Sequence, residues 1–191
     1  AGQPAVSRGL MQPGQPIWWI PARILSVGVP AAVLMCAGWL WSMELPEVQW
    51  HEGVVRTELA AVVQTLAVTI GPRSYTDPIN LNAAADFISQ RLDSFGYQVT
   101  AQPYQVGELT FRNIIAERRG TEQPDRVIVI GAHYDTVVGS PGADDNASGA
   151  AVLLELARLH AQTRFRKTVR FVAFTLEEPP LFRSRHMGSR D

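Results

Sequence analysis

Apolar side chains recur every three or four residues along two stretches of the chain between residues 54 and 95. This spacing puts them on one face of a helix, so the sequence predicts two amphipathic helices. The first ends near Gly71-Pro72, and the second extends from Leu81 to Phe95, where Gly96 supplies a C-terminal stop. The apolar positions of the first helix are Val54, Val55, Leu59, Val62, Val63, Leu66 and Ile70.

Farther along, the apolar residues form the shorter runs that are typical of strands. Tyr97 to Val106 and Leu109 to Glu117 are predicted as paired strands, and Arg126 to Ala132 and Thr168 to Thr175 as buried strands. A helix is predicted between the two buried strands, over Ala150 to His160. This order predicts an α/β domain with a mixed β-sheet flanked by helices, and an active site is expected where the two buried strands end.

A long uncharged stretch precedes this domain. Residues 1–16 are rich in Gly, Pro and Gln and are predicted to be a disordered tail. The twenty residues between Arg23 and Glu44 carry no charge, and as a helix they would span ~30 Å, the thickness of a hydrocarbon core. Tryptophans lie near both ends of residues 17–43, so we predict one N-terminal transmembrane helix there, followed by a linker, 44–51.

The charges that flank the apolar segment predict its orientation. Arg8 and Arg23 precede it and Glu44 and Glu47 follow it, which favours a cytoplasmic N-terminus and an extracytoplasmic domain. A cleaved signal peptide is one alternative, but its apolar region would usually be shorter and followed by small residues. A buried core helix is another, which Pro30 slightly favours.

The composition excludes several kinds of function. The net charge is -1, from 17 basic and 18 acidic residues, so we expect no nucleic-acid partner. Cys36 is the only cysteine, and it lies in the apolar segment, which excludes an intrachain disulfide and a multi-thiolate zinc site. Any metal would therefore be held mainly by nitrogen and oxygen ligands.

Residues of metal-ligand type gather in the sequence GAHYDTVVGSPGADDNASG, which follows the first buried strand. His133 and Asp135 are two residues apart on the extension of this strand, so their side chains point to the same side. The imidazole can bind a metal through one nitrogen while Asp135 accepts the N–H of the other. Taken alone, such a pair is more often a local hydrogen bond than a metal site.

Two pairs of adjacent carboxylates lie at the same edge. Asp144-Asp145 precedes the predicted helix, and a role in capping that helix would account for one of them but not for both. Glu177-Glu178 follows the second buried strand. Successive residues of an extended segment face opposite sides, so one glutamate can bind metal while the other handles protons. The alternative is a pair of surface charges at the end of a strand.

Together, GAHYDTVVGSPGADDNASGAAVLLELAR and VRFVAFTLEEPPLFRSRHMGS resemble the co-catalytic zinc aminopeptidases of peptidase family M28. The resemblance covers residues 52–191. It implies that His133 ligates one of two Zn²⁺ ions and that Asp135 orients His133. It also implies that Asp144 bridges the two ions, with a cis peptide bond between Asp144 and Asp145.

For the second strand end, the resemblance implies that Glu178 ligates the other zinc and that Glu177 is the general base. Two zincs would lower the pKa of a shared water toward ~7, and Glu177 would take its proton and later protonate the leaving amine. The implied substrates are the N-termini of peptides or proteins.

The sequence departs from the family in one respect. A catalytic zinc usually has three protein ligands, and the family supplies a further carboxylate and a histidine beyond the position of Asp191. His51, His160 and His186 are not expected to replace them. We therefore expect a C-terminally incomplete and inactive peptidase, with strand 168–175 left as an exposed edge. The alternatives are a non-catalytic membrane-anchored ectodomain of degenerate peptidase fold and a single-zinc transferase like glutaminyl cyclase.

Overall fold

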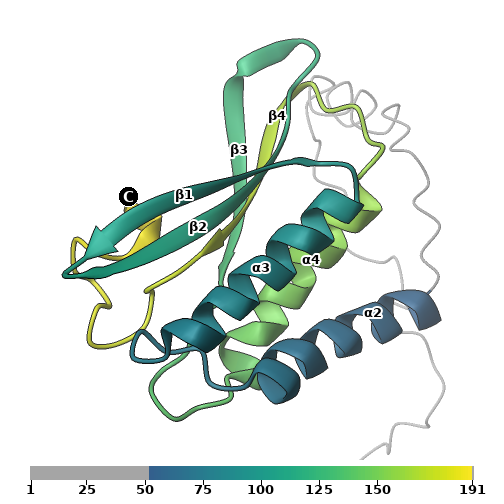
Figure 1. The fold of residues 1–191 in the computed structure, drawn as a ribbon. Coiled ribbons are helices and arrows are strands. Elements are labelled where there is room, and N and C mark those ends of the chain that lie inside the picture. The colour runs from purple at the N-terminus through teal and green to yellow at the C-terminus, as the bar shows by residue number, and fades with distance from the viewer. Residues whose placement is uncertain (1–51, 191) are drawn as a thin grey trace, which may run out of the picture. The chain divides into compact units, whose positions relative to one another are not determined.

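The computed structural model describes residues 52–190. The tail, the transmembrane segment and the linker that the sequence predicts lie outside these residues. The described part forms an α/β domain (Figure 1). Its elements are α2 (Glu52–Gln64), η1 (Thr65–Ile70), α3 (Pro78–Ser94), β1 (Gln98–Val106), β2 (Leu109–Arg118), β3 (Gln123–His133), η2 (Ala143–Ser148), α4 (Gly149–Leu159), β4 (Lys167–Phe174) and η3 (Gly188–Arg190).

The four strands form one mixed sheet in the order β1-β2-β4-β3. β1 and β2 pair antiparallel, as do β2 and β4, whereas β3 and β4 pair parallel. This confirms the predicted mixed sheet. The expectation that strand 168–175 is an exposed edge is wrong, because β4 pairs on both of its sides. The edge strands are β1 and β3, and in β3 the side chains of Val127, Ile128 and Val129 are 43–55% exposed.

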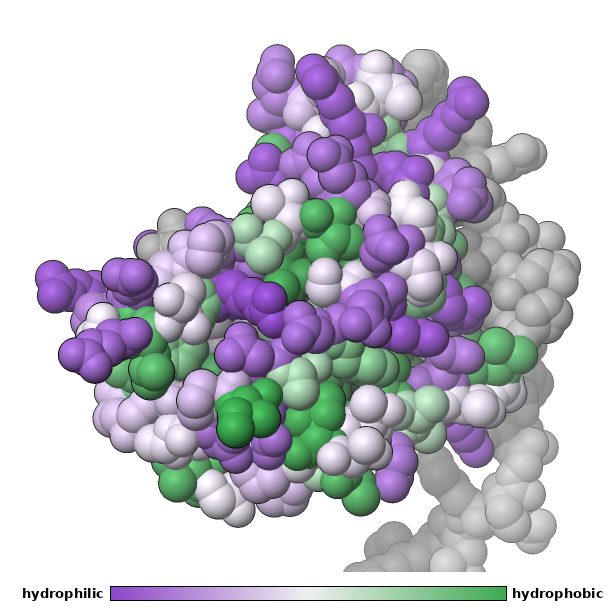
Figure 2. Space-filling model, viewed as in Figure 1, coloured by the Kyte–Doolittle hydropathy of each residue, from purple (hydrophilic) through white to green (hydrophobic). Residues whose placement is uncertain are grey.

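α3 and α4 lie side by side along the sheet, and α2 packs next to α4 (Figure 1). The interface between these helices and the sheet is the hydrophobic core of the domain. On the face viewed in Figure 2, hydrophobic residues lie in small groups among hydrophilic ones. The largest fully buried apolar side chains include Leu66, Ile88, Leu92, Leu154 and Phe171.

The first predicted helix comprises α2 and η1, and it ends where the sequence predicts. Its last turn is π-helical, with the N–H of Gly71 donating to the carbonyl of Leu66 at 3.1 Å. Gly71 has φ +85°, a conformation that glycine adopts without strain, and the helix ends there. In α3, the side chain of Asp77 caps the helix by accepting from the N–H of Asn80.

Within residues 52–190, one helical stretch is long and apolar enough to cross a membrane by length and composition. This stretch is Gly53–Ile70, with a mean hydropathy of 1.4. Val62, Leu66 and Ala67 of the same stretch belong to the hydrophobic core. The stretch is therefore part of the folded domain, and it is distinct from the predicted anchor at 17–43.

Candidate metal centre

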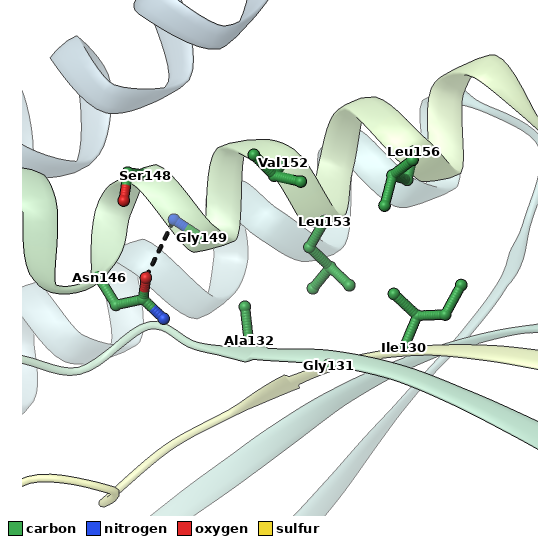
Figure 3. Close-up of a pocket in the computed structure, with 9 residues that line it drawn as sticks. All are labelled: Ile130, Gly131, Ala132, Asn146, Ser148, Gly149, Val152, Leu153 and Leu156. Atoms are coloured by element: carbon green, nitrogen blue, oxygen red, sulfur yellow. Dashed lines mark hydrogen bonds between the residues drawn. The ribbon is translucent and has the colours of Figure 1, made fainter. Parts of the chain in front are cut away.

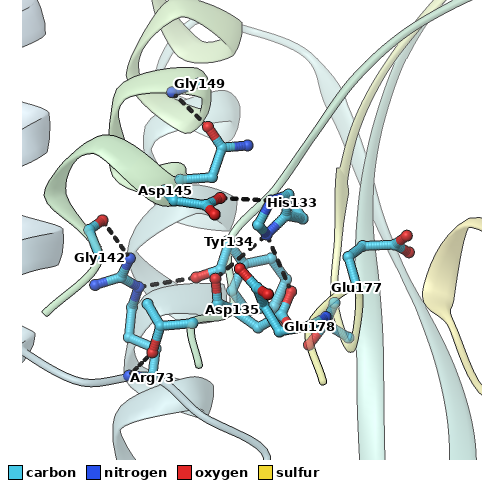
Figure 4. Close-up of polar contacts among 12 residues, drawn as sticks. Arg73, His133, Tyr134, Asp135, Gly142, Asp145, Gly149, Glu177 and Glu178 are labelled. Atoms are coloured by element: carbon cyan, nitrogen blue, oxygen red, sulfur yellow. Dashed lines mark hydrogen bonds and ion pairs between the residues drawn. The ribbon is translucent and has the colours of Figure 1, made fainter. Parts of the chain in front are cut away.

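Three side chains of metal-ligand type meet beyond the carboxyl ends of β3 and β4: those of His133, Asp145 and Glu178. Their ligand atoms all lie within 4.8 Å of one another, and His133 Nε2 is 3.1 Å from Asp145 Oδ1 (Figure 4). The parallel register pairs His133 with Phe174, so the two strands end side by side. An imidazole and two carboxylates are a donor set that suits Zn²⁺.

Asp135 is 2% exposed and contacts two members of this group. Its Oδ2 accepts a hydrogen bond from the N–H of Glu178 at 3.1 Å, and its Oδ1 lies 3.4 Å from His133 Nδ1. The same ring nitrogen is 3.3 Å from the backbone carbonyl of Asp135. Because Nδ1 faces Asp135, the other ring nitrogen is left to face Asp145. This is the arrangement that a metal-binding histidine with a carboxylate partner requires.

At the aspartate pair, the structure differs from the sequence-based expectation. Asp145 belongs to the group, whereas Asp144 lies outside it and is exposed, with its carbonyl accepting a hydrogen bond from Ser148 Oγ. The cis peptide bond likewise joins Asp145 to Asn146, not Asp144 to Asp145. Asp145 has an extended conformation (φ -112°, ψ 93°) that interrupts the helical turn of η2. This local backbone conformation directs Asp145 toward His133, and residue spacing alone does not reveal it.

The two glutamates after β4 point to opposite sides of the chain (Figure 4). Glu178 faces His133 and Asp145, whereas Glu177 points away from them. Both oxygens of the Glu177 carboxylate are hydrogen-bonded to Ser189, which donates from its N–H at 2.7 Å and from its Oγ at 2.9 Å. The alternation that the sequence predicts for this pair is therefore present.

Burial and an excess of negative charge shift the pKa values of two residues in the group. Burial lowers the pKa of His133, but the hydrogen bond to Asp135 and the charges of Asp135, Asp145 and Glu178 outweigh it, so the net shift is upward. The pKa of Glu178 is raised by burial and then by the charge of Asp145. Both pKa values are raised, as expected where carboxylates gather close to a histidine and to one another. Such a concentration of negative charge suits a cation.

A cavity of about 370 Å³ adjoins the group, between β3 and α4. Ile130 and Ala132 of β3 face Leu153 and Leu156 of α4 across it (Figure 3). Asn146, the residue after Asp145, is at one end, and its Oδ1 accepts a hydrogen bond from the N–H of Gly149 at 3.0 Å. The cavity therefore offers a mainly apolar surface next to the candidate ligands.

Sequence reasoning missed two residues of this region. Asp145 is adjacent to Asp144, and this adjacency is the only sequence signal that points to it. Arg73 is fully buried beside the loop that follows β3 (Figure 4). It comes directly after Gly71-Pro72 at the end of a helix, where a charged residue is ordinarily solvated, so the sequence carries no signal for its burial.

Comparison with curated proteins finds relatives over most of the chain. The uncharacterized protein YfbL of Escherichia coli (strain K12) is 40% identical over 157 residues, which are 78% of this chain and 47% of YfbL. A probable zinc metalloprotease of Pyricularia oryzae is 31% identical over 176 residues, covering 77% of this chain and 35% of the relative. The chain thus spans half or less of the length of these relatives.

Solved structures share the fold. A zinc aminopeptidase from Bacillus subtilis, BSAP, matches with a TM-score of 0.59 at 16% identity, over 64% of this chain and 61% of that one. Porphyromonas gingivalis glutaminyl cyclase matches with a TM-score of 0.54 at 32% identity, over 61% and 44%. The model of peptidase family M28 matches residues 113–191, which include His133, Asp145, Glu177 and Glu178. This part of the chain belongs to peptidase family M28.

Proposed function

We propose that this chain carries the metal-binding half of a zinc metallopeptidase that cleaves peptide bonds at the N-termini of its substrates. The observation that carries the proposal is the convergence of His133, Asp145 and Glu178 within 4.8 Å at the ends of two parallel strands. Membership of residues 113–191 in family M28 and the zinc metalloprotease name of a 31% identical relative support it. The aminopeptidase specificity is a finer proposal, supported by the fold that the chain shares with a zinc aminopeptidase.

The geometry suits the roles proposed for four of the residues. His133, Asp145 and Glu178 would hold zinc, which when bound supplies a Lewis acid and an acidified water. Asp135 orients the His133 ring and accepts a hydrogen bond from the N–H of Glu178. Glu177 is the proposed general base, which would take a proton from water and return it to the leaving amine. This role rests on the family resemblance, because in the structure the Glu177 carboxylate points away from the group and is hydrogen-bonded to Ser189.

We further propose two zinc ions for the complete site. His133 and Asp145 would hold one of them and Asp145 and Glu178 the other, so each ion would have two protein ligands. Within residues 52–190, no other histidine, cysteine or carboxylate joins this group. A catalytic zinc usually has three protein ligands, so we propose that the 191-residue chain by itself does not turn over peptides.

The full chain is therefore expected to bind zinc without hydrolysing aminoacyl-p-nitroanilides, because each ion lacks a ligand. Metal analysis after dialysis and the release of p-nitroaniline test the two halves of this expectation. Turnover that is abolished in Glu177→Gln and retained in Glu108→Gln, a change in the exposed β1–β2 turn, would contradict the proposed inactivity. A chain that binds no zinc would instead support a non-catalytic ectodomain.

The likeness to a glutaminyl cyclase at 32% identity favours a second candidate function, a single-zinc cyclising transferase. A substrate with an N-terminal glutamine separates the two. Hydrolysis releases free glutamine, whereas cyclisation releases ammonia and leaves the peptide 17 Da lighter. Mass spectrometry of the products formed from this substrate would therefore distinguish a peptidase from a cyclising transferase.

The predicted N-terminal anchor leads to a separate expectation. A helix over residues 17–43 that spans the membrane is held there by burial of apolar side chains, so the chain should stay in the membrane pellet after extraction with alkaline carbonate. A variant with Leu34→Arg should move to the soluble fraction, because a charge near the centre of such a helix opposes insertion. Release of the unaltered chain by carbonate would contradict the anchor.

A further inference from the structure

The largest fully buried side chain among residues 52–190 is that of an arginine, Arg73. Its guanidinium makes five hydrogen bonds, all to backbone carbonyls. Nε donates to Tyr134 at 2.8 Å, and Nη2 donates to Gly142 at 3.1 Å. Nη1 donates to Leu66, Gly71 and Pro141 at 2.7, 2.9 and 2.8 Å. Three separate segments of the chain therefore meet at one side chain.

Two of these segments carry the candidate ligands. Tyr134 directly follows His133, and Gly142 precedes Asp145 by three residues. By binding the carbonyls of both, Arg73 joins the two ends of the loop that separates His133 from Asp145 (Figure 4). The backbone strengthens the same connection, because the N–H of Arg73 donates to Thr136 Oγ1 at 3.0 Å and the N–H of Thr136 donates to the carbonyl of Arg73 at 3.2 Å.

The space around the contact between Arg73 and Gly142 is tight. Gly142 has φ +56°, and a Cβ at this position would overlap the side chain of Thr136 and the carbonyl of Asp145. The carbonyl of Gly142 also accepts from the N–H of Ala147 at 3.0 Å. The loop is thus fixed on one side by the guanidinium and on the other by the turn that presents Asp145.

The charge of Arg73 is retained at neutral pH. Burial lowers the pKa of Arg73 to about 10, and the charge of Asp135 opposes this shift. A buried guanidinium is costly unless it is hydrogen-bonded, and here carbonyl oxygens accept hydrogen bonds from all three of its nitrogens. A lysine has three donors on one nitrogen and cannot reproduce the planar fork that reaches all three segments at once.

We propose that Arg73 is a positioning residue of the metal centre, which sets the separation between His133 and Asp145 by binding the two ends of the loop between them. The proposal rests on the metal-binding role of the two residues. Arg73 lies in the connection between η1 and α3. The proposal gives it an effect on metal affinity although it does not contact the metal.

The test compares Arg73→Met and Arg73→Lys with Arg91→Met in the full 191-residue chain. Arg91 is a matched control, since it forms an ion pair with Glu58 at 2.7 Å on the helical side of the domain. Zinc affinity is measured by competition with a chromophoric chelator, the geometry of the site by the visible spectrum of bound Co²⁺, and folding by circular dichroism during thermal unfolding.

Arg73→Met is expected to fold and to bind zinc at least about 10-fold more weakly, in the range found when supporting residues of metal sites are lost. Its Co²⁺ spectrum should change, and Arg73→Lys should recover part of the affinity because it donates to some of the carbonyls. Arg91→Met should bind zinc like the unaltered chain.

Folded Arg73 variants with unaltered zinc affinity and Co²⁺ spectrum would overturn the proposal and leave the metal site intact. If neither Arg73 variant folds, Arg73 is needed for the fold itself, and the proposal is likewise wrong. If the unaltered chain binds no zinc, the proposed function fails first and this inference falls with it.

Discussion

Replacing Asp145 by asparagine is expected to weaken zinc binding by more than about 100-fold, because loss of a direct ligand exceeds the 10- to 100-fold cost of losing a residue that supports one. The amide keeps the size of the side chain but removes the negative charge that faces His133 Nε2 at 3.1 Å. Asparagine also leaves the backbone of the turn unchanged, so the effect on folding should be small.

The adjacent residue supplies the control for this experiment. Asp144→Asn makes the same chemical change one position earlier, on an exposed side chain outside the group, and should leave zinc affinity within about twofold, as expected for a charge screened by solvent. Chelator competition on both variants decides between the two aspartates. A large loss in Asp144→Asn with little change in Asp145→Asn would restore the sequence-based choice of Asp144.

The second large effect is expected in the core. Phe171 lies in β4, is 0% exposed and contacts the ring of Tyr97 edge-to-face, with 5.5 Å between the ring centroids. Truncation to alanine should lower the free energy of unfolding by about 3–5 kcal/mol, since it removes buried area and leaves a cavity. For a domain of this size, that corresponds to a decrease in Tm of roughly 10 °C or more.

Phe182→Ala is the matched control, because Phe182 is 51% exposed and loses little contact on truncation. Its Tm should stay within about 2 °C of that of the unaltered chain. Thermal unfolding followed by circular dichroism measures both variants. Similar Tm values for the two would show that β4 is not the central strand of a packed sheet.

Much of this architecture can be predicted from local patterns. The periodicity of apolar residues predicts helices close to α2, α3 and α4, and the β-branched runs predict β3 and β4, because these patterns reflect which side of each element is buried. The position of His133 and of the glutamate pair at the strand ends follows from the same patterns. Local patterns do not contain the order of the strands, so they do not show that β4 pairs on both of its sides and that β1 and β3 are the edges.

The candidate site likewise contains residues that local patterns predict and residues that they do not. His133 ends β3, and Asp135 and Glu178 follow strands closely, where the alternation of side chains predicts which residues share a side. Asp144 and Asp145 lie in an irregular turn, and the choice between them depends on the extended backbone at Asp145. The burial of Arg73 depends on five carbonyls from segments up to 69 residues away in sequence, so it becomes visible only in the folded chain.

The parallel pairing of β3 with β4 also bears on how the protein folds. His133 and Glu178 lie at opposite ends of the β3–α4–β4 crossover, and their side chains approach only after that long loop has closed. Closing such a loop costs chain entropy before its contacts form, which makes non-local parallel pairing a slow step. A metal ion that needs both residues would therefore bind after this step, and its binding energy would mainly slow unfolding rather than speed folding.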